Sequence, residues 1–148
     1  KSIGVVFTQK VASELHPYTT MAAVDSAGNI SYAGGRYQYN RLTGRTSSFG
    51  TYCLVADTTP PVITPQFEQG QDMRSKNRLS VRLSDNFAGI ASYNAYIDER
   101  WVAVDYSRGR IHIDLRAEGI SGGKKHTIRV VAKDNCGNKT SWEGEFIR

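Results

Sequence analysis

The feature that most constrains this chain is a two-residue alternation of apolar and polar side chains that recurs along it. The alternation runs from Leu79 to Leu83, from Ile111 to Leu115 and from His126 to Ala132. It is typical of half-buried strands, because successive side chains of a strand point to opposite faces of its sheet. No segment shows the sustained 3.6-residue pattern of an amphipathic helix. The sequence therefore predicts an all-β protein.

Turn-forming residues divide the second part of the chain into about seven short strands, which is the number in an immunoglobulin-like β-sandwich. The run at His126–Ala132 is predicted to be a central strand. There is no Cys-Trp-Cys arrangement of the antibody type. The expected strands lie near Val62, Leu79, Ile111 and Ile128, and at Ile90–Ile97, Trp101–Asp105 and Trp142–Ile147.

The first part of the chain contains shorter strand candidates separated by expected turns at Gly28-Asn29, Gly34-Gly35 and Gly44. Five or six strands in fewer than about 60 residues predict a small sheet or an incomplete sandwich. The candidates are Ile3–Phe7, Thr20–Val24, Ile30–Ala33, Tyr37–Tyr39 and Thr51–Val55.

The clearest boundary signal is the segment D-T-T-P-P at Asp57–Pro61. Adjacent prolines remove two backbone donors and fix φ, so the chain leaves one sheet extended and enters the next at an edge. We therefore expect a small β domain at residues 1–57, a stiff proline-rich linker at 58–61 and an immunoglobulin-like sandwich at 62–148.

The pattern D-x-x-G-N follows an apolar strand in each part of the chain. In a tight hairpin the Asp side chain accepts backbone N–H groups, and Gly supplies a positive φ. The carboxylate could instead bind calcium, but one Asp and one Asn fall well short of six to eight oxygen ligands. We favour structural turns and expect neither a metal nor another cofactor. The residues concerned are Asp25, Gly28 and Asn29, and then Asp134, Gly137 and Asn138.

Catalytic constellations are missing from the sequence, which argues against an enzyme. His112 and Asp114 would share one face of a strand, but they supply at most two of the three protein ligands of a catalytic zinc. No G-x-S-x-G segment occurs, and Asp98-Glu99 lies in an expected turn where solvation is favoured over a raised pKa. Cys53 and Cys136 belong to no C-x-x-C pair, and two unbridged thiols are favoured over a disulfide.

The charge balance does not indicate a nucleic-acid-binding protein. Lys and Arg outnumber Asp and Glu by 19 to 14, giving a net charge of +5. The basic stretches, Arg74–Arg82 and Lys124–Arg129, alternate with polar or apolar residues, as the solvated face of a strand does. No stretch approaches the roughly 20 apolar residues of a membrane span. The chain starts with Lys-Ser-Ile and no signal-peptide pattern, so we expect a mature product or a piece of a longer protein.

Aromatic residues provide the main binding hypothesis. Tyr37, Tyr39 and Tyr96 are candidate ligand contacts that would stack on sugar rings or receive a peptide. Core packing is the competing interpretation, and we favour it for Trp101 and Trp142 because aromatic side chains dominate β-sandwich cores.

Four segments, taken together, carry a family resemblance. They resemble the β-sandwich region that follows the catalytic domain of lysostaphin-type zinc metallopeptidases of Bacteroidetes, and the last three are also similar to many bacterial immunoglobulin-like and fibronectin type III-like domains. The segments are FGTYCLVADTTPP (Phe49–Pro61), LSDNFAGI (Leu83–Ile90), YIDERWVAVDY (Tyr96–Tyr106) and VVAKDNCGN (Val130–Asn138).

The resemblance implies an extracytoplasmic protein, either periplasmic, secreted or on the cell surface. It implies a non-catalytic accessory, spacer or docking region beside a catalytic domain of the same polypeptide that cuts peptidoglycan cross-bridge peptides. The histidine and aspartate zinc ligands of that family are not in this chain. The alternative is a stand-alone module whose surface binds a glycan, such as peptidoglycan, or a peptide.

Overall fold

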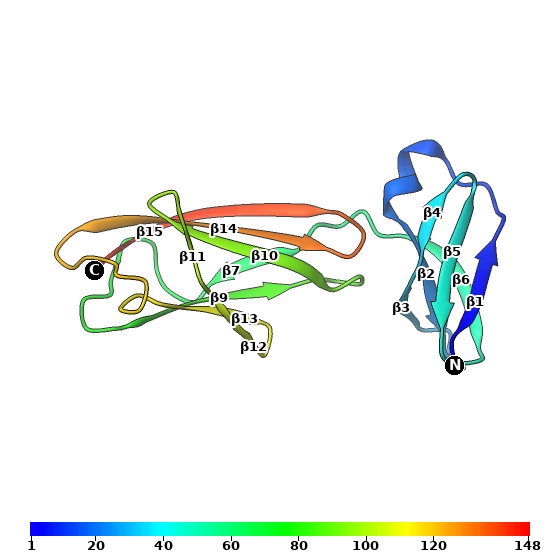
Figure 1. Cartoon of the computed structure of the whole chain (residues 1–148), viewed down its shortest axis with the longest axis horizontal. Coiled ribbons are helices and arrows are strands. Elements are labelled where there is room, and N and C mark those ends of the chain that lie inside the picture. The colour runs from blue at the N-terminus through cyan, green and yellow to red at the C-terminus, as the bar shows by residue number, and fades with distance from the viewer. The chain divides into compact units, whose positions relative to one another are not determined.

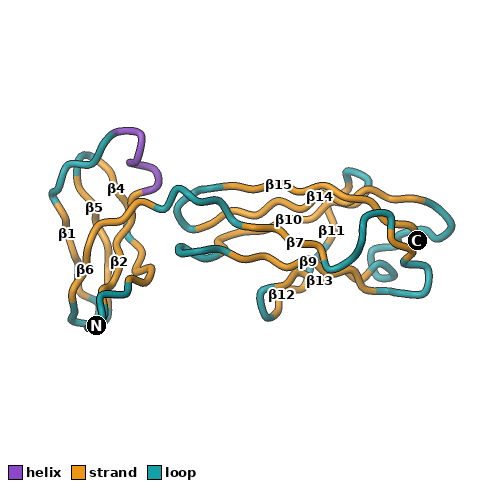
Figure 2. The backbone as a smooth tube through the Cα atoms, turned by 180° about the vertical axis from the view of Figure 1, so that it is seen from behind, coloured by secondary structure: helices purple, strands orange, loops and turns teal.

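The computed structural model describes residues 1–148 and confirms an all-β protein (Figure 1). The one helical element is a six-residue 3₁₀ helix, η1 (Ser13–Tyr18), drawn in purple in Figure 2. No helix is both long enough and apolar enough to cross a membrane. The chain forms two compact units. The first comprises Lys1–Thr59, Asn86–Gly89 and Asp134–Asn138, and the second comprises Pro60–Asp85, Ile90–Lys133 and Lys139–Arg148.

The first unit contains two three-stranded antiparallel sheets, with strand orders β1-β5-β4 and β3-β2-β6. Its core is small: only Met21, Tyr37 and Leu42 form the buried hydrophobic cluster, with partly buried side chains packed around them. The strands are β1 (Ile3–Phe7), β2 (Thr19–Val24), β3 (Ile30–Gly34), β4 (Arg36–Gln38), β5 (Arg41–Thr46) and β6 (Thr51–Ala56).

Strand β5 is not among the strands predicted from the sequence, because the pattern predicts a turn at Gly44. In the structure Gly44 lies within β5, opposite Val5 of β1. A β-carbon at this position would come within 3.0 Å of the Met21 side chain. The glycine therefore permits close approach inside a strand and does not end it.

Two loops from the second half of the sequence belong to the first unit. The side chain of Asn135 donates to the carbonyl of Ala88 at 2.8 Å, which joins the loops to each other. The ring of Phe87 meets Tyr32 edge to face, with 6.1 Å between ring centroids. Asp57, at the end of the first part of the chain, accepts the backbone N–H of Ala88 at 3.2 Å. These contacts enlarge a unit whose own core is small.

The second unit is a sandwich of a five-stranded and a four-stranded sheet, with orders β11-β10-β14-β15-β8 and β12-β13-β9-β7 (Figure 1). Strand β8 pairs with β15 in parallel, whereas β11 with β10, β14 with β15, and the strands of the four-stranded sheet pair antiparallel. The strands are β7 (Val62–Pro65), β8 (Gln71–Asp72), β9 (Arg78–Ser84), β10 (Ile90–Ile97), β11 (Arg100–Val102), β12 (Asp105–Ser107), β13 (Arg110–Asp114), β14 (Lys125–Asp134) and β15 (Lys139–Ile147).

This connectivity is that of an immunoglobulin-like sandwich. Strands β7, β9, β13 and β12 occupy positions A, B, E and D of one sheet, and β10, β14 and β15 occupy positions C, F and G of the other. Two short strands, β8 and β11, are additional. The predicted strand at Trp101–Asp105 is instead divided, because β11 pairs with β10 whereas β12 pairs with β13 in the opposite sheet.

The apolar side chains of the alternating pattern fill the core between these sheets. Strand β14 is central, as predicted, and turns Ile128, Val130 and Ala132 inward. Leu79 and Val81 of β9 approach from the opposite sheet as part of the same cluster. Because the side-chain period is two, the outward residues of β14 form part of a solvent-facing surface.

Both D-x-x-G-N segments form tight hairpin turns with the same hydrogen bonds. One carboxylate oxygen of Asp25 or Asp134 accepts the backbone N–H groups two and four residues further on, at 2.8 or 2.9 Å. The Asn side chain that ends each motif donates to the other oxygen. Gly28 and Gly137 have φ values of 84° and 90°. The turns differ in burial, since Asp25 is exposed whereas Asp134 is 1% exposed.

We predict that Asp134→Ala destabilises the protein far more than Asp25→Ala does. Removing the Asp134 carboxylate leaves the N–H groups of Cys136 and Asn138 without acceptors inside a buried turn, at a cost of about 3 kcal/mol. Water replaces the lost carboxylate in the exposed turn of Asp25. Urea denaturation of the two variants measures the difference, and equal losses of stability would contradict the part assigned to burial.

Candidate functional site

The outer face of the five-stranded sheet of the second unit carries a recess of about 290 Å³. This volume is at the small end of the range for ligand pockets, so it suits one group of a ligand better than a whole drug-sized molecule. The backbone of the paired residues Ile128 and Gly144 lies at its centre. The other lining residues are Gln69, Tyr96, Glu99, Thr127, Arg129, Glu143 and Glu145.

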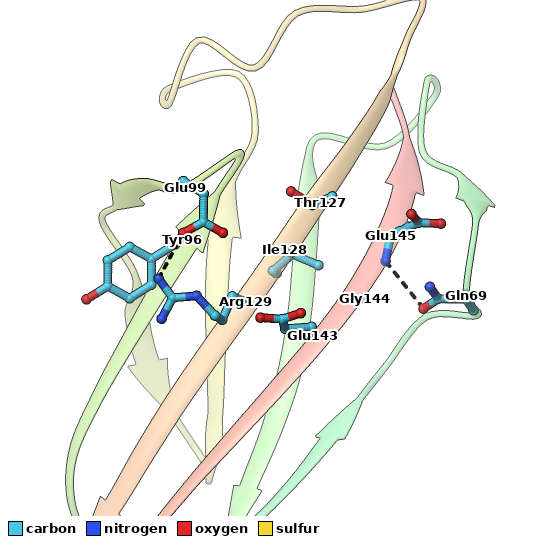
Figure 3. A pocket seen from close by; sticks show the side chains of 9 residues that line it. All are labelled: Gln69, Tyr96, Glu99, Thr127, Ile128, Arg129, Glu143, Gly144 and Glu145. Atoms are coloured by element: carbon cyan, nitrogen blue, oxygen red, sulfur yellow. Dashed lines mark hydrogen bonds and ion pairs between the residues drawn. The ribbon is translucent and has the colours of Figure 1, made fainter.

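Strand pairing positions the side chains around this recess, as Figure 3 shows. Arg129 of β14 is directly opposite Glu143 of β15, and the next outward pair is Thr127 with Glu145. On the far side of β15, the side-chain oxygen of Gln69 accepts the backbone N–H of Glu145 at 3.3 Å. The recess is therefore built on regular strands, which position side chains more rigidly than loops do.

Arg129 turns away from Glu143, its neighbour across the strands. Its guanidinium is stacked on the ring of Tyr96, 4.2 Å from the centroid, and forms an ion pair with Glu99 at 3.2 Å (Figure 3). Glu145 is paired with Lys125 at 2.5 Å. The side chain of Glu143 has neither a hydrogen-bond nor an ion-pair partner. The three glutamates of the recess, set against Arg129 and Lys125, leave a net formal charge of −1 in a chain whose net charge is +5.

Asp98 holds the β10–β11 turn in place, and Glu99 follows it in the same turn. Asp98 accepts hydrogen bonds from Nδ1 of His126 at 2.6 Å and from the backbone N–H of Thr127 at 3.0 Å. Burial raises the pKa of Asp98, but the hydrogen bonds from His126 and Thr127 outweigh burial and hold the pKa below its ordinary value. The second ring nitrogen of His126 is 2.9 Å from the carbonyl oxygen of Ser121, so both ring nitrogens have a polar partner.

Trp101 adds a large aromatic surface beside the recess. It is directly opposite Tyr96 on the adjacent strand, and 56% of its surface is exposed. Its indole N–H donates to the side-chain oxygen of Asn94 at 3.1 Å, which restrains the ring. The expectation that Trp101 fills a core is therefore wrong, because a short edge strand places it on the outer face. Trp142 instead packs against the core and meets Phe67 edge to face.

The three tyrosines proposed as ligand contacts are not brought together. Tyr37 is 4% exposed in the core of the first unit, where its hydroxyl donates to the carbonyl of Gln9 and accepts the N–H of Val11. It therefore presents no ring face to a ligand. Tyr39 is 90% exposed at the β4–β5 turn of the same unit. Only Tyr96 lines the recess, and Arg129 covers one face of its ring.

His112 and Asp114, which share one strand face in the sequence prediction, bind different partners. Nδ1 of His112 is 2.7 Å from the hydroxyl of Ser80, whereas Asp114 accepts backbone N–H groups of the turn that follows it. In the first unit the carboxylates of Asp57 and Asp134 are buried and within 4.8 Å of one another. Each accepts backbone N–H groups, which accounts for its burial.

The sequence contained a signal for His126 that the turn-based interpretation of Asp98 missed. His126 alternates in register with the inward residues Ile128 and Val130, so it had to be buried. A buried imidazole needs polar partners, and turn residues at the ends of neighbouring strands can supply them. The recess had no comparable signal, because its lining residues come from four separate segments of the sequence.

Comparisons with known proteins leave the family open. No protein-family model matches the chain, and no curated protein matches its sequence. Among solved structures, the fibronectin(III)-like modules of CbhA from Clostridium thermocellum are similar, with a TM-score of 0.46 and 12% identity over 99% of this chain and 85% of that one. This likeness is too distant to bring functional information to the chain.

The hydrogen bond between His126 and Asp98 predicts a pH dependence. A carboxylate whose pKa is lowered by folding stabilises the protein above about pH 4, and this contribution is lost as the pH falls through the folded-state pKa. We expect His126→Leu to raise the pKa of Asp98. The free energy of unfolding that Asp98 contributes, and that is lost in acid, should then be smaller. His112→Leu is the control, because His112 is bonded to a serine. NMR titration of the Asp98 carboxyl carbon measures both, and an unchanged pKa in His126→Leu would contradict the assignment.

Proposed function

We propose that this chain is a non-catalytic accessory region of a secreted or periplasmic cell-wall metallopeptidase, which spaces or docks the adjacent catalytic domain. The observation that carries this proposal is how the segment Asp57–Pro61 is held at both ends. Within the first unit, the backbone carbonyl of Asp57 accepts a 2.8 Å hydrogen bond from the Asn138 side chain. Within the second unit, the carbonyl of Pro61 accepts a 2.6 Å bond from the hydroxyl of Thr140.

Such anchoring suits a spacer better than a flexible tether. A Gly/Ser-rich linker behaves as a random coil, whereas this segment has two prolines and polar anchors close to them. The resemblance of Phe49–Pro61 and the later segments to the region after lysostaphin-type catalytic domains supports the same role. Under this proposal the catalytic partner lies elsewhere in the same polypeptide, outside the cytoplasm.

The histidines considered as zinc ligands are held apart from each other in the structure. His112 and His126 bond to separate partners, and neither lies in a group of three potential metal ligands. The recess on the second unit is lined by three glutamates, two of which are ion-paired, and by Arg129.

A second candidate function is that of a surface-binding module for a glycan or a peptide. The observation that favours it is the restrained, exposed indole of Trp101 on the same sheet face as the polar recess. Large exposed aromatic side chains next to a polar rim are typical of binding surfaces. The two functions are compatible, because a docking region of a wall hydrolase can also bind its substrate.

We predict that deleting residues 1–148 from the full-length protein reduces the digestion of intact cell walls several-fold. The rate on a short soluble cross-bridge peptide should not change, because no residue of this chain takes part in the chemistry. Turbidity loss of purified walls and chromatography of the peptide products measure the two rates.

The isolated chain is the control and should hydrolyse neither substrate. An equal loss on the soluble peptide would contradict the accessory role, as would undiminished digestion of walls. A full-length sequence without a zinc-peptidase domain would remove the peptidase context altogether.

A further inference from the structure

We propose that the outer face of β11, β10, β14 and β15 is a binding site for a saccharide that carries a free amino group. This inference rests on the second candidate function and names its ligand. The site combines Trp101 as a stacking platform with the recess between Arg129 and Glu143 as the polar end. All of its residues belong to the second unit, so the site is complete within one compact body.

The platform is suited to the apolar face of a sugar ring. An indole offers a large flat surface, and at Trp101 more than half of the side chain is open to solvent. The hydrogen bond to Asn94 restrains the ring before any ligand arrives, which lowers the entropy cost of binding. Tyr96 does not compete for this role, because the Arg129 guanidinium already covers one face of its ring.

The recess provides the hydrogen-bonding groups that sugar hydroxyls require. A carboxylate accepts hydrogen bonds through two oxygens, and the Gln69 amide has an N–H₂ group left over after its oxygen bonds to Glu145. The distance between the two ends is also suitable. Trp101 and Glu143 are three strand spacings apart, about 14 Å, so a ligand that reaches both must be an oligosaccharide.

The charge of the recess decides between classes of saccharide. Glu99 is paired with Arg129 and Glu145 with Lys125, so one negative charge in the recess, that of Glu143, has no cationic partner. An ammonium group on the sugar compensates this charge, whereas the carboxylate of a uronic acid adds to it. A neutral N-acetylated sugar gains nothing from Glu143 beyond an ordinary hydrogen bond. The expected order of affinity is therefore amino sugar, then N-acetyl sugar, then uronic acid.

The test is calorimetric titration of the full chain with oligomers of glucosamine, N-acetylglucosamine and galacturonic acid, up to about 10 mM ligand. We expect the glucosamine oligomer to bind most tightly and its affinity to fall as salt is added, since the contact is ionic. Trp101→Ala should weaken binding of the glucosamine oligomer at least about tenfold. Glu143→Gln should weaken it about fivefold, and this second variant should leave the affinity for the N-acetyl oligomer unchanged. Both residues are exposed, so neither change removes a core contact.

Two control variants distinguish binding at this site from nonspecific binding elsewhere on the surface. Phe49→Ala removes another exposed aromatic ring, and Glu14→Gln removes another exposed carboxylate, both in the first unit. Neither should alter binding. Equal effects of Phe49→Ala and Trp101→Ala would overturn the assignment of the platform.

Other outcomes distinguish this inference from the functions proposed above. Equal affinity for the amino and N-acetyl oligomers would overturn the inference but keep a glycan-binding module. Binding of tri-lysine that is indifferent to Trp101→Ala would overturn it in favour of a peptide site. No binding to any oligomer would overturn both the inference and the glycan-binding function. The accessory role would not be affected, because the cell-wall digestion assay tests it independently.

Discussion

Strand β14 (Lys125–Asp134) determines most of what the second unit can be. Its inward residues enter the core, and its outward residues Thr127 and Arg129 line the recess. A shift of one residue in its register would exchange these two sets, bringing the arginine into the core and the isoleucine and valine into water. The apolar alternation therefore fixes the sandwich and, through the same period, fixes which polar side chains meet on the outer face.

His126 shows how that constraint extends to the ends of the sheet. It occupies an inward position of β14, where an unpaired imidazole would be costly, and it is satisfied by Asp98 and the Ser121 carbonyl. The bond to Asp98 fixes the β10–β11 turn, and that turn presents Glu99 to Arg129. A buried polar residue in one strand thus helps to position an ion pair at the edge of the recess. Stability and the geometry of the outer face are linked through this contact.

The two D-x-x-G-N turns illustrate the difference between local and tertiary control. Their sequences and internal hydrogen bonds are nearly identical, yet Asp25 faces solvent whereas Asp134 is buried in the first unit. The local pattern dictates the turn, because the Asp carboxylate and the positive φ of glycine act within five residues. Packing alone decides whether the loss of such a turn is minor or severe.

The sequence by itself determined the all-β class, the central position of β14, most strands and the turns between them. These features depend on side-chain period and on local turn chemistry, both of which a single chain displays. It did not determine β5, the division of Trp101–Asp105 between two sheets, or the exposure of Trp101. Gly44 is predicted to be a turn residue, but it lies inside β5, close to Met21. Trp101 is predicted to be a core residue, but it is exposed because β11 is at the edge of its sheet. The recess also depends on tertiary structure alone, because strand pairing brings together segments that are distant in the sequence and only that pairing sets Arg129 beside an unpaired Glu143.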